Sequence, residues 1–359
     1  MIRVGLIGYG LAGSVFHAPL VSATPGMTLT SVVTGDPRRQ ERVRQAHPGA
    51  VIFDRVDDLW AAAPGHDLVI VATPTGTHVG VGLQAVIAGL PAVIDKPLGS
   101  SAAEARQLVA EAARRRAWLS VFHNRRWDSE TLTAKSLLTS GRLGRPLRFE
   151  SRFERWRPES NPDAWREQTS ADEGGGILLD LGSHLVDQAL YLFGGPLSVY
   201  AEVETRRGGN ASEDDVFLAL EHPGGVRSHL WASALAADRG PSLRLLGSAG
   251  AYVKDGLDGQ EDALRGGATP GGPGWGIEAP SAWGRLVAGD QSTPVETLAG
   301  AWPSYYLGVV ESLTTGTPPP VTPEDAVAVL EVLDAARESA RRRQVTPLPS
   351  SSSRNTPPA

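Results

Sequence analysis

A lysine in an arginine-rich chain is the first candidate for chemistry. Lys96 follows the apolar run Ala92–Ile94 and Asp95, and it precedes Pro97. The chain has 34 basic residues, and only three of them are lysines. A lysine near apolar walls can be tuned toward acid–base chemistry, whereas an arginine keeps its proton. Lys96 is therefore a candidate for proton transfer, and the alternative is an exposed charge that ends a strand.

A carboxylate and a histidine form the second candidate pair. Asp180 and His184 follow three glycines, at residues 174–176, and are four residues apart in a helical pattern. This spacing places both side chains on one helix face, where an aspartate can orient a histidine and support its charged form. Histidine is the usual acid–base group near neutral pH. Asp187 is an alternative partner for His184. If the pair is not catalytic, these polar residues simply form the solvent-exposed face of a helix. One local histidine in a chain without cysteine does not predict a metal site.

A glycine-rich segment predicts a dinucleotide site. It follows the apolar run Ile2–Ile7 and precedes a helical stretch from Ser14 to Ser22. In this context the first glycine allows a tight turn, the second lets a pyrophosphate approach, and the third lets helix and strand pack closely. The helix N-terminus then faces the anion. The candidate cofactor-binding residues here are Gly8, Tyr9, Gly10, Leu11, Ala12 and Gly13.

The elements that position these residues alternate over the first third of the chain. Strand-like runs occur at Ile2–Ile7, Leu29–Thr34, Leu68–Ala72, Ala92–Ile94 and Trp118–Phe122, with helical stretches between them. The alternation predicts an α/β Rossmann domain over residues 1–122, with a doubly wound parallel sheet and a ligand at the strand ends. Thr73, Pro74, Thr75 and His78 follow one strand and Lys96 follows the next, so we expect them to face the same crevice.

The pattern changes after residue 122. Longer, alternating strands are expected at residues 147–155, 197–204, 216–220, 226–232 and 243–246, with a hairpin turn at 221–225. They predict a second α/β domain, residues 123–345, with a large and mostly antiparallel open sheet. Residues 265–276 are rich in Gly and Pro and predict a surface loop. A helix is expected to begin at Thr322-Pro323 and run to about Arg343. Residues 346–359 are rich in Pro and Ser and predict a disordered tail.

Composition excludes several classes of function. With 359 residues the chain should form two domains, and 41% apolar and 21% charged residues are typical of globular proteins. A net charge of −6 gives no basic footprint for nucleic acid. There is no cysteine for disulfides or thiolate metal sites. No signal peptide and no apolar run long enough for a membrane is found, so we expect a cytoplasmic protein without a membrane partner.

Two segments could bind a substrate. Arginine, asparagine and tryptophan side chains can hold a polyol or sugar by hydrogen bonds and ring contact. The alternative for each residue is packing at the domain junction. The candidates are Asn124, Arg126 and Trp127 at that junction, and Trp165 and Arg166 before the glycine run.

Together these motifs resemble the Gfo/Idh/MocA oxidoreductases over roughly residues 1–345. The glycine motif, the segment 73–78, Asp95-Lys96-Pro97 and the Asp180/His184 pair occur in that family's order and spacing. Residues 16–19, 121–128 and 252–256 resemble a bacterial subgroup that includes NADP-dependent scyllo-inositol dehydrogenases. The family often has asparagine where this chain has Thr75.

The resemblance implies a reaction and an assembly. It implies that Asp95, Lys96 and Pro97 lie at the cofactor, that Lys96 hydrogen-bonds the reacting oxygen, and that His184, supported by Asp180, takes the hydroxyl proton as hydride leaves. The substrate would be an inositol-like polyol or a sugar. In many members the open sheets pack together, so a homodimer or homotetramer is expected. The alternatives are a non-catalytic nucleotide-sensing protein, and a glycosidase-like member that recycles a tightly bound cofactor.

The end of the second strand favours NADP over NAD. An acid that binds the adenosine ribose should end this strand, and Thr34 occupies that position. Asp36 is followed by Pro37, a pair typical of a helix start, so Asp36 is interpreted as an N-cap. A small hydroxyl at Thr34 leaves room for a 2′-phosphate, which Arg38 and Arg39 could neutralise.

Overall fold

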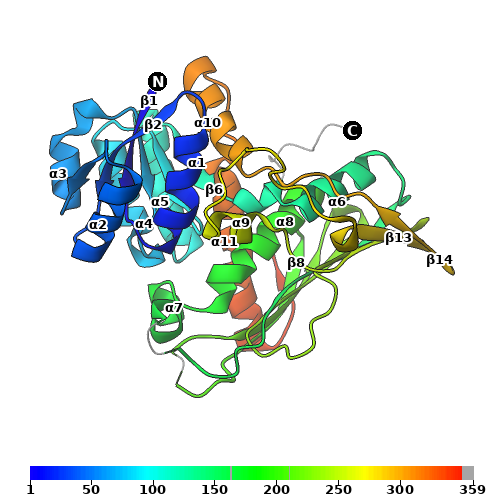
Figure 1. Ribbon diagram of the computed structural model, residues 1–359. Helices are drawn as coiled ribbons and strands as arrows, with labels where there is room; N and C mark the ends of the chain where they lie inside the picture. The colour runs from blue at the N-terminus through cyan, green and yellow to red at the C-terminus, as the bar shows by residue number, and fades with distance from the viewer. Residues whose placement is uncertain (162–163, 210, 350–359) are drawn as a thin grey trace. The chain divides into compact units, whose positions relative to one another are not determined.

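The chain forms two compact units that interleave in sequence. The computed structural model describes residues 1–161, 164–209 and 211–349 (Figure 1). Unit 1 comprises Met1–Trp127, Gly259–Trp275 and Ala301–Val327. Unit 2 comprises Asp128–Asp258, Gly276–Gly300 and the chain from Ala328 onward. The sequence predicted one boundary after residue 122, whereas two later segments also belong to unit 1.

Unit 1 contains the predicted doubly wound sheet. Its six strands run parallel in the order β3-β2-β1-β4-β5-β6, so the strand order reverses between β1 and β4. At such a reversal the loops diverge and leave a crevice at the carboxyl ends of the strands. The strands are β1 (Ile2–Ile7), β2 (Met27–Val33), β3 (Val51–Phe53), β4 (Leu68–Val71), β5 (Ala92–Asp95) and β6 (Leu119–Phe122).

A side-chain cap defines one of the helix starts in unit 1. Asp36 accepts hydrogen bonds from the backbone N–H groups of Arg38 (2.8 Å) and Arg39 (3.2 Å), so its interpretation as an N-cap is confirmed. The helix expected from Ser14 begins as a π-helical turn, Ala12–His17, and continues as α1. The helices are α1 (Ala18–Ala23), α2 (Pro37–Ala46), α3 (Val56–Ala61), α4 (His78–Ile87), α5 (Ala102–Arg115), α9 (Gln260–Arg265) and α10 (Pro303–Thr315).

An aromatic cluster from distant parts of the sequence fills one side of unit 1. The Phe122 ring, at the end of β6, lies 4.9 Å from the Tyr305 ring of α10 between centroids, and 5.7 Å from that of Tyr306. The hydroxyl groups of Tyr305 and Ser120 are 2.9 Å apart. All four side chains are buried. Helix α10 is therefore part of the core of unit 1 although it lies near the end of the chain.

Unit 2 contains the expected open, mostly antiparallel sheet. Its order is β14-β13-β12-β11-β7-β10-β9-β8-β15, and among the described strands of this sheet only β7 and β10 pair in parallel. Thr346–Pro347 form β15 against β8, and residues 350–359 of the predicted tail lie outside the described residues. The strands are β7 (Pro146–Glu154), β8 (Ser198–Glu204), β9 (Asp215–Glu221), β10 (Arg227–Ser233), β11 (Leu243–Gly247), β12 (Gly250–Lys254), β13 (Gly284–Ala288), β14 (Gln291–Val295) and β15 (Thr346–Pro347).

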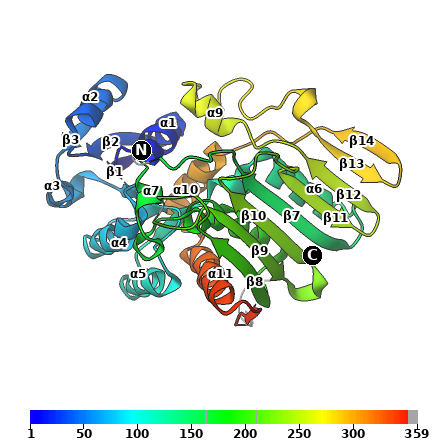
Figure 2. The same ribbon diagram turned by 90° about the horizontal axis from the view of Figure 1, so that it is seen from below.

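Helices cover one face of this sheet. Residues of β7 alternate, so that Phe149 and Phe153 are buried on the side of the helices. Figure 2 shows strands β7 to β10 side by side. The helices of unit 2 are α6 (Ser129–Thr139), α7 (Trp165–Gln168), α8 (Ser183–Phe193) with a π-helical turn before it (Leu178–Gly182), and α11 (Pro323–Arg342), whose first residues belong to unit 1.

The opposite face of the sheet carries charged and aromatic side chains. Glu150 on β7 accepts hydrogen bonds from the Nη2 of Arg152 (3.2 Å) and the Nη1 of Arg244 (3.0 Å). The Arg152 guanidinium also lies 3.9 Å from the centroid of the Trp231 ring on β10, which packs against Phe217 on β9. This open face is therefore organised by ion pairs and ring contacts rather than by aliphatic packing.

His222, at the turn between β9 and β10, predicts a loss of stability in mild acid. It is fully buried, with its Nδ1 2.9 Å from the Gly194 carbonyl and its Nε2 2.8 Å from the Ser228 hydroxyl. Burial lowers its pKa to about 4. The unfolded chain binds the proton near pH 6.5, so the stabilisation is present above that pH and is lost as the pH falls toward 4. Between pH 7.5 and pH 5 we expect this group to remove about 2 kcal/mol from the free energy of unfolding.

Urea denaturation at the two pH values measures this effect. Replacing His222 with glutamine lowers stability at pH 7.5, because buried partners are left unpaired. It also makes the free energy of unfolding less dependent on pH than in the wild type. An equal pH dependence in both proteins would show that His222 takes up its proton as readily in the folded state as in the unfolded one.

Candidate active site

The glycine turn after β1 has the geometry that a dinucleotide requires. Gly8 has φ +99°, and a Cβ there would lie 2.5 Å from the carbonyl oxygen of Ala72. A Cβ on Gly13 would lie 2.1 Å from the carbonyl oxygen of Gly8. A Cβ on Gly10 would meet only the Nη1 of Arg39, at 4.0 Å. The first and third glycines are thus required by packing, whereas the second leaves room for a bound group beside an arginine.

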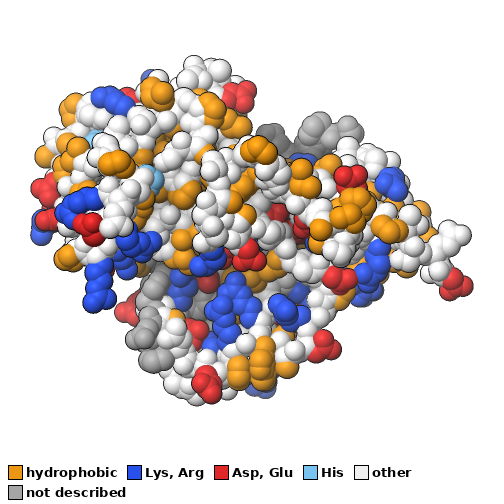
Figure 3. Space-filling view, in the orientation of Figure 1, with side chains coloured by type: hydrophobic (Ala, Val, Ile, Leu, Met, Phe, Trp, Pro, Cys, Tyr) orange, Lys and Arg blue, Asp and Glu red, His pale blue; other side chains and the backbone are white. Residues whose placement is uncertain are grey.

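The end of β2 combines a small hydroxyl with arginines. Thr34 is buried, and its backbone N–H donates to Phe53 on β3. The Nε of Arg39 lies 3.5 Å from the Asp36 carboxylate, both partly exposed. The backbone hydrogen bonds of α2, together with the charges of Arg39 and Arg38, hold the pKa of Asp36 below its usual value. Figure 3 shows basic side chains gathered over α2, with acidic ones beside them.

Arg42 is a further basic residue at this turn that the sequence interpretation missed. Its Nη2 donates to the Ser14 hydroxyl at 3.0 Å, and its guanidinium carbon lies 5.8 Å from the centroid of the buried Tyr9 ring. Ser14 in turn donates from both its N–H and its hydroxyl to the Gly10 carbonyl. The signal was available, because Arg42 is three residues after Arg39 on the same helix and therefore shares its face.

His78 joins the loops that follow β4 and β5. Its Nε2 lies 2.8 Å from the carbonyl oxygen of Thr73, and its Nδ1 lies 2.7 Å from that of Pro97. Both contacts are hydrogen bonds only when both ring nitrogens carry protons, as in the imidazolium form. The structure thus brings the predicted residues Thr73, His78 and Pro97 together. Pro74 and the buried Thr75 lie in the same loop.

Asp95 supports the backbone of Lys96 from inside the unit. The Lys96 N–H donates to the Asp95 Oδ1 at 2.9 Å, and the same oxygen lies 3.6 Å from the Nε2 of buried His17. Burial alone would raise the pKa of Asp95, but the contact with His17 and the charges of His17, Lys96 and His78 hold it below its usual value. His17 is held by the Tyr306 hydroxyl, 2.6 Å from its Nδ1. Lys96 itself is partly exposed at the end of β5.

Asp180 and His184 lie on the helical segment of unit 2 that follows the glycine run. His184 is buried, with its ring stacked at 6.4 Å from the Phe153 ring of β7. Asp180 is partly exposed, and its Oδ1 lies 3.3 Å from the Nε of Arg166. The alternative carboxylate, Asp187, is buried on α8. Arg166, a predicted substrate residue, and Asp180, a predicted catalytic residue, therefore form an ion pair.

The other predicted substrate residues have structural partners inside unit 1. Asn124, Arg126 and Trp127 form a 3₁₀ turn after β6. The Nη1 of Arg126 donates to the Asp325 carboxylate at 3.0 Å, and the Trp127 ring packs edge-on against Tyr305 at 5.8 Å. These contacts match the packing alternative for this turn, and the substrate role remains a prediction. The side chain of Trp165 lies outside the described part of the structure.

Comparisons with known proteins agree with this fold. Residues 2–123 match the oxidoreductase family with an NAD-binding Rossmann fold, and residues 131–253 match the GFO/IDH/MocA C-terminal domain. Scyllo-inositol 2-dehydrogenase (NADP(+)) IolW of Bacillus subtilis is 35% identical over 96% of this chain and 95% of its own length. The uncharacterized oxidoreductase YdgJ of Escherichia coli is 38% identical over 95% of this chain and 97% of its own length.

A solved structure supports the same conclusion. That of yvaA from Bacillus subtilis superposes with a TM-score of 0.89, is 33% identical, and covers 97% of this chain and 100% of its own. The Rossmann unit, the glycine turn and the second α/β unit together define an NAD(P)-dependent oxidoreductase. The chain belongs to the Gfo/Idh/MocA family.

No helix among the described residues has the length and apolar character that crossing a membrane requires. Within the same residues, no group of three or more His, Asp or Glu side chains could hold a metal ion.

Proposed function

We propose that this protein is an NADP-dependent dehydrogenase that oxidises a hydroxyl of an inositol-like polyol or a sugar. The observation that carries the proposal is Lys96, partly exposed at the end of β5, at the same edge of the sheet as the glycine turn after β1. The loops that bear them are linked through His78 and through the contact of Gly8 with Ala72. Ligands of this fold bind at that edge.

The reaction needs a base, a hydride acceptor and a fixed geometry between them. When bound, the nicotinamide supplies the hydride acceptor. In the proposed reaction His184 takes the hydroxyl proton while the C–H bond of the same carbon breaks and the C=O bond forms. Lys96 donates a hydrogen bond to the reacting oxygen. Asp180 supports the imidazolium that His184 becomes.

The preference for NADP is proposed from the end of β2. Thr34 places no carboxylate there, and Arg39 and Arg42 lie beside the glycine turn. A 2′-phosphate carries about two negative charges, and its hydrogen bonds to arginine are roughly twice as strong as neutral ones. The name of the Bacillus relative, which specifies NADP(+), agrees with this proposal.

Replacing an arginine of α2 tests the cofactor preference. We expect Arg38→Ala or Arg39→Ala to weaken NADPH binding by about 10–100-fold and NADH binding much less, because one charge-assisted hydrogen bond is worth about 1.5–3 kcal/mol. Thr34→Asp should shift the preference toward NADH, because a carboxylate repels the phosphate and can accept the ribose hydroxyls. Fluorescence titration with both cofactors measures these changes.

Arg44→Ala is the matched control on the same helix. Arg44 is exposed and pairs with Glu41 at 3.1 Å, so its loss should change neither affinity. If the wild type binds NADH more tightly than NADPH and Asp36→Ala abolishes that binding, then Asp36 binds the ribose and the proposed NADP preference is wrong.

An absorbance screen tests the substrate class. Formation of reduced cofactor would be followed with inositols, aldoses and, in reverse, ketoses, with NADP and NAD in parallel. The proposal requires net turnover of added cofactor with a polyol or sugar. Tight cofactor binding without net turnover would instead favour the glycosidase-like or nucleotide-sensing alternative.

We also propose that the protein is a homodimer or homotetramer that associates through the open face of the unit 2 sheet. The support is the ordered network of Glu150, Arg152 and Trp231 on that face. Sedimentation of the wild type and of Trp231→Ala would test it, because the variant should be dissociated at protein concentrations at which the wild type remains assembled.

A further inference from the structure

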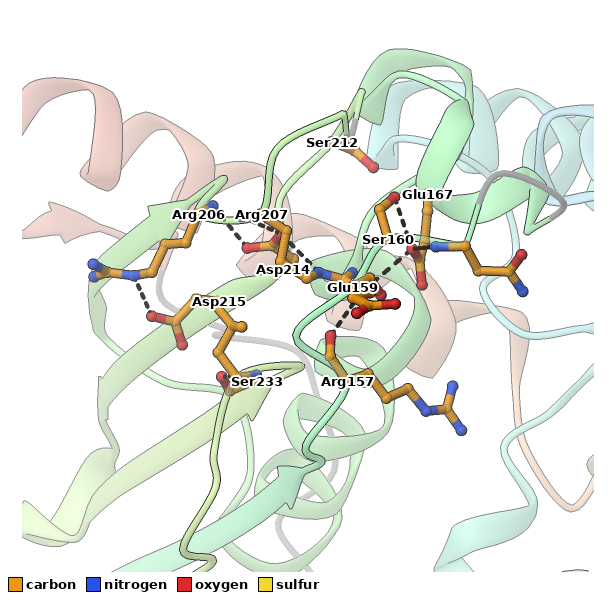
Figure 4. Close-up of polar contacts among 12 residues, drawn as sticks. Arg157, Glu159, Ser160, Glu167, Arg206, Arg207, Ser212, Asp214, Asp215 and Ser233 are labelled. Atoms are coloured by element: carbon orange, nitrogen blue, oxygen red, sulfur yellow. Dashed lines mark hydrogen bonds and ion pairs between the residues drawn. The ribbon is translucent and has the colours of Figure 1, made fainter.

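Arg207, in the turn between β8 and β9, carries a buried charge that the proposed reaction does not use. Its side chain is 4% exposed, and its Nε donates to the Asp214 Oδ2 at 3.1 Å. Asp214 is also buried and accepts from the backbone N–H groups of Arg206 (2.8 Å) and Arg207 (3.0 Å). Figure 4 shows the Arg207 side chain beside Asp214, whereas the Arg206 side chain points away toward Asp215. A buried charge that lacks well-placed partners is strongly destabilising.

The same guanidinium holds the segment that leads to α7. The Nη1 of Arg207 donates to the carbonyl oxygens of Arg157 (3.1 Å) and Glu159 (3.3 Å), and lies 3.4 Å from the Glu167 carboxylate. Glu167 in turn accepts from the N–H of Asn161 at 2.9 Å. One side chain therefore connects the turn, the preceding loop and the short helix that carries Arg166 (Figure 4).

Backbone contacts from this turn fix Arg166 itself. The Ser212 hydroxyl donates to the carbonyl oxygen of Arg166 at 3.1 Å, and the N–H of Ala211 donates to that of Glu167 at 2.9 Å. The N–H of Gly176 also donates to the Arg166 carbonyl, at 3.0 Å. With its backbone held at these points, Arg166 reaches Asp180 through its side chain.

The turn also holds the helical segment that bears Asp180. The backbone oxygen of Glu213 accepts from Ile177 at 3.0 Å, and its Oε1 accepts from Leu178 at 3.2 Å. A Cβ on Gly176 would lie 2.3 Å from that Oε1, so the glycine makes room for the carboxylate. The described residues of this turn, 205–209 and 211–214, thus hold both members of the Arg166–Asp180 ion pair.

We propose that Arg207 is a positioning residue that sets the Arg166–Asp180 pair and thereby the orientation of the proposed catalytic residues of unit 2. This inference rests on the proposed function. Misplacement of a catalytic group by about 1 Å can lower a rate by about 100-fold even when the altered residue is remote. Arg207 acts through Arg166, so its effect should disappear when Arg166 is already absent.

Arg206 provides a matched control in the same turn. Its side chain is 55% exposed and pairs with Asp215 on the sheet rather than with the α7 segment. Exposed ion pairs contribute little to stability. Arg206→Gln removes the same charge from the neighbouring position, so it separates a general effect of the turn from the specific effect of Arg207.

The test is a double-mutant cycle with the polyol found in the absorbance screen. We expect Arg207→Gln and Arg166→Gln each to lower kcat/KM by about 10–100-fold with unchanged affinity for NADPH, and the double variant to be no slower than the slower single variant. Arg206→Gln should stay within about twofold of the wild type, within the small effect of an exposed pair. Additive losses, or an Arg207→Gln variant as active as the wild type, would overturn the inference.

Two further measurements keep the test decisive. Arg207→Lys keeps the charge beside Asp214 but cannot reach both carbonyl oxygens, so it should fold and still show a reduced kcat/KM. Amide hydrogen exchange at Ala211 and Gly176 should accelerate in both Arg207 variants and not in Arg206→Gln. Accelerated exchange supports the positioning role even if the wild type oxidises no polyol, which would count only against the proposed function. Unchanged exchange counts against Arg207 itself.

Discussion

Replacing Lys96 with alanine is expected to lower turnover by about 10²–10⁴-fold, the usual contribution of a positioned proton-transfer group. The affinity for NADPH should change little, because the glycine turn and the arginines of α2 are untouched. Asp95 and His78 hold the Lys96 backbone and the neighbouring loop, so the fold around the vacant position should persist. Steady-state kinetics and fluorescence titration of the same preparations measure both quantities.

Lys135→Ala is the control for loss of a lysine. Lys135 is exposed on α6, and its Nζ lies 3.8 Å from the centroid of the Tyr191 ring, within unit 2. The Lys135→Ala variant should keep wild-type turnover. A folded Lys96→Ala protein with near-normal turnover would remove Lys96 from the mechanism.

The second large effect is expected at His184. His184→Ala should be slowed by about 10²–10⁴-fold, because the hydroxyl proton loses its acceptor. Asp180→Asn should also be slow without loss of fold, since the amide keeps the shape of the carboxylate but cannot support the imidazolium. Measurement of kcat for both variants, with thermal unfolding as the check on the fold, tests the pair.

Asp187→Asn decides which carboxylate serves His184. Asp187 is buried three residues beyond His184, whereas Asp180 is partly exposed and paired with Arg166. We expect the Asp187 variant to affect stability more than turnover. If turnover falls in Asp187→Asn and not in Asp180→Asn, then the wrong carboxylate was assigned.

Strong local signals explain which strands could be predicted. Strands β4, β5 and β6 are wholly buried and four of the six residues of β1 are buried, and their mostly apolar runs are visible in the sequence. β3 has three residues at the sheet edge, none of them buried, and β14 is mostly exposed with a proline inside it. Such edge strands are defined by pairing with a neighbour rather than by their own hydrophobic pattern, so the sequence alone did not reveal them.

The candidate site divides in the same way. The Asp36 cap depends on neighbours two and three residues away, and the structure confirms it. The glycine turn also has a clear local pattern in the sequence, although Gly8 packs against the distant Ala72. The contacts of Arg207 and Glu213 join residues 35 to 50 positions apart, and nothing in their own surroundings in the sequence signals a role. Arg166 was noted as a substrate candidate, but its pairing with Asp180 depends on those distant contacts.

The late arrival of α10 in unit 1 has a consequence for how the protein is made. Trp302, Tyr305 and Tyr306 are fully buried, yet the ribosome reaches them only after all of residues 128–258 and 276–300. At about 5–20 residues per second, the nascent Rossmann sheet waits roughly ten to thirty-five seconds for these rings. During that interval Phe122 and His17 lack their aromatic neighbours and present an apolar surface to chaperones. A fragment that ends at Trp127 would lack Trp302, Tyr305 and Tyr306 and would therefore keep this apolar surface exposed.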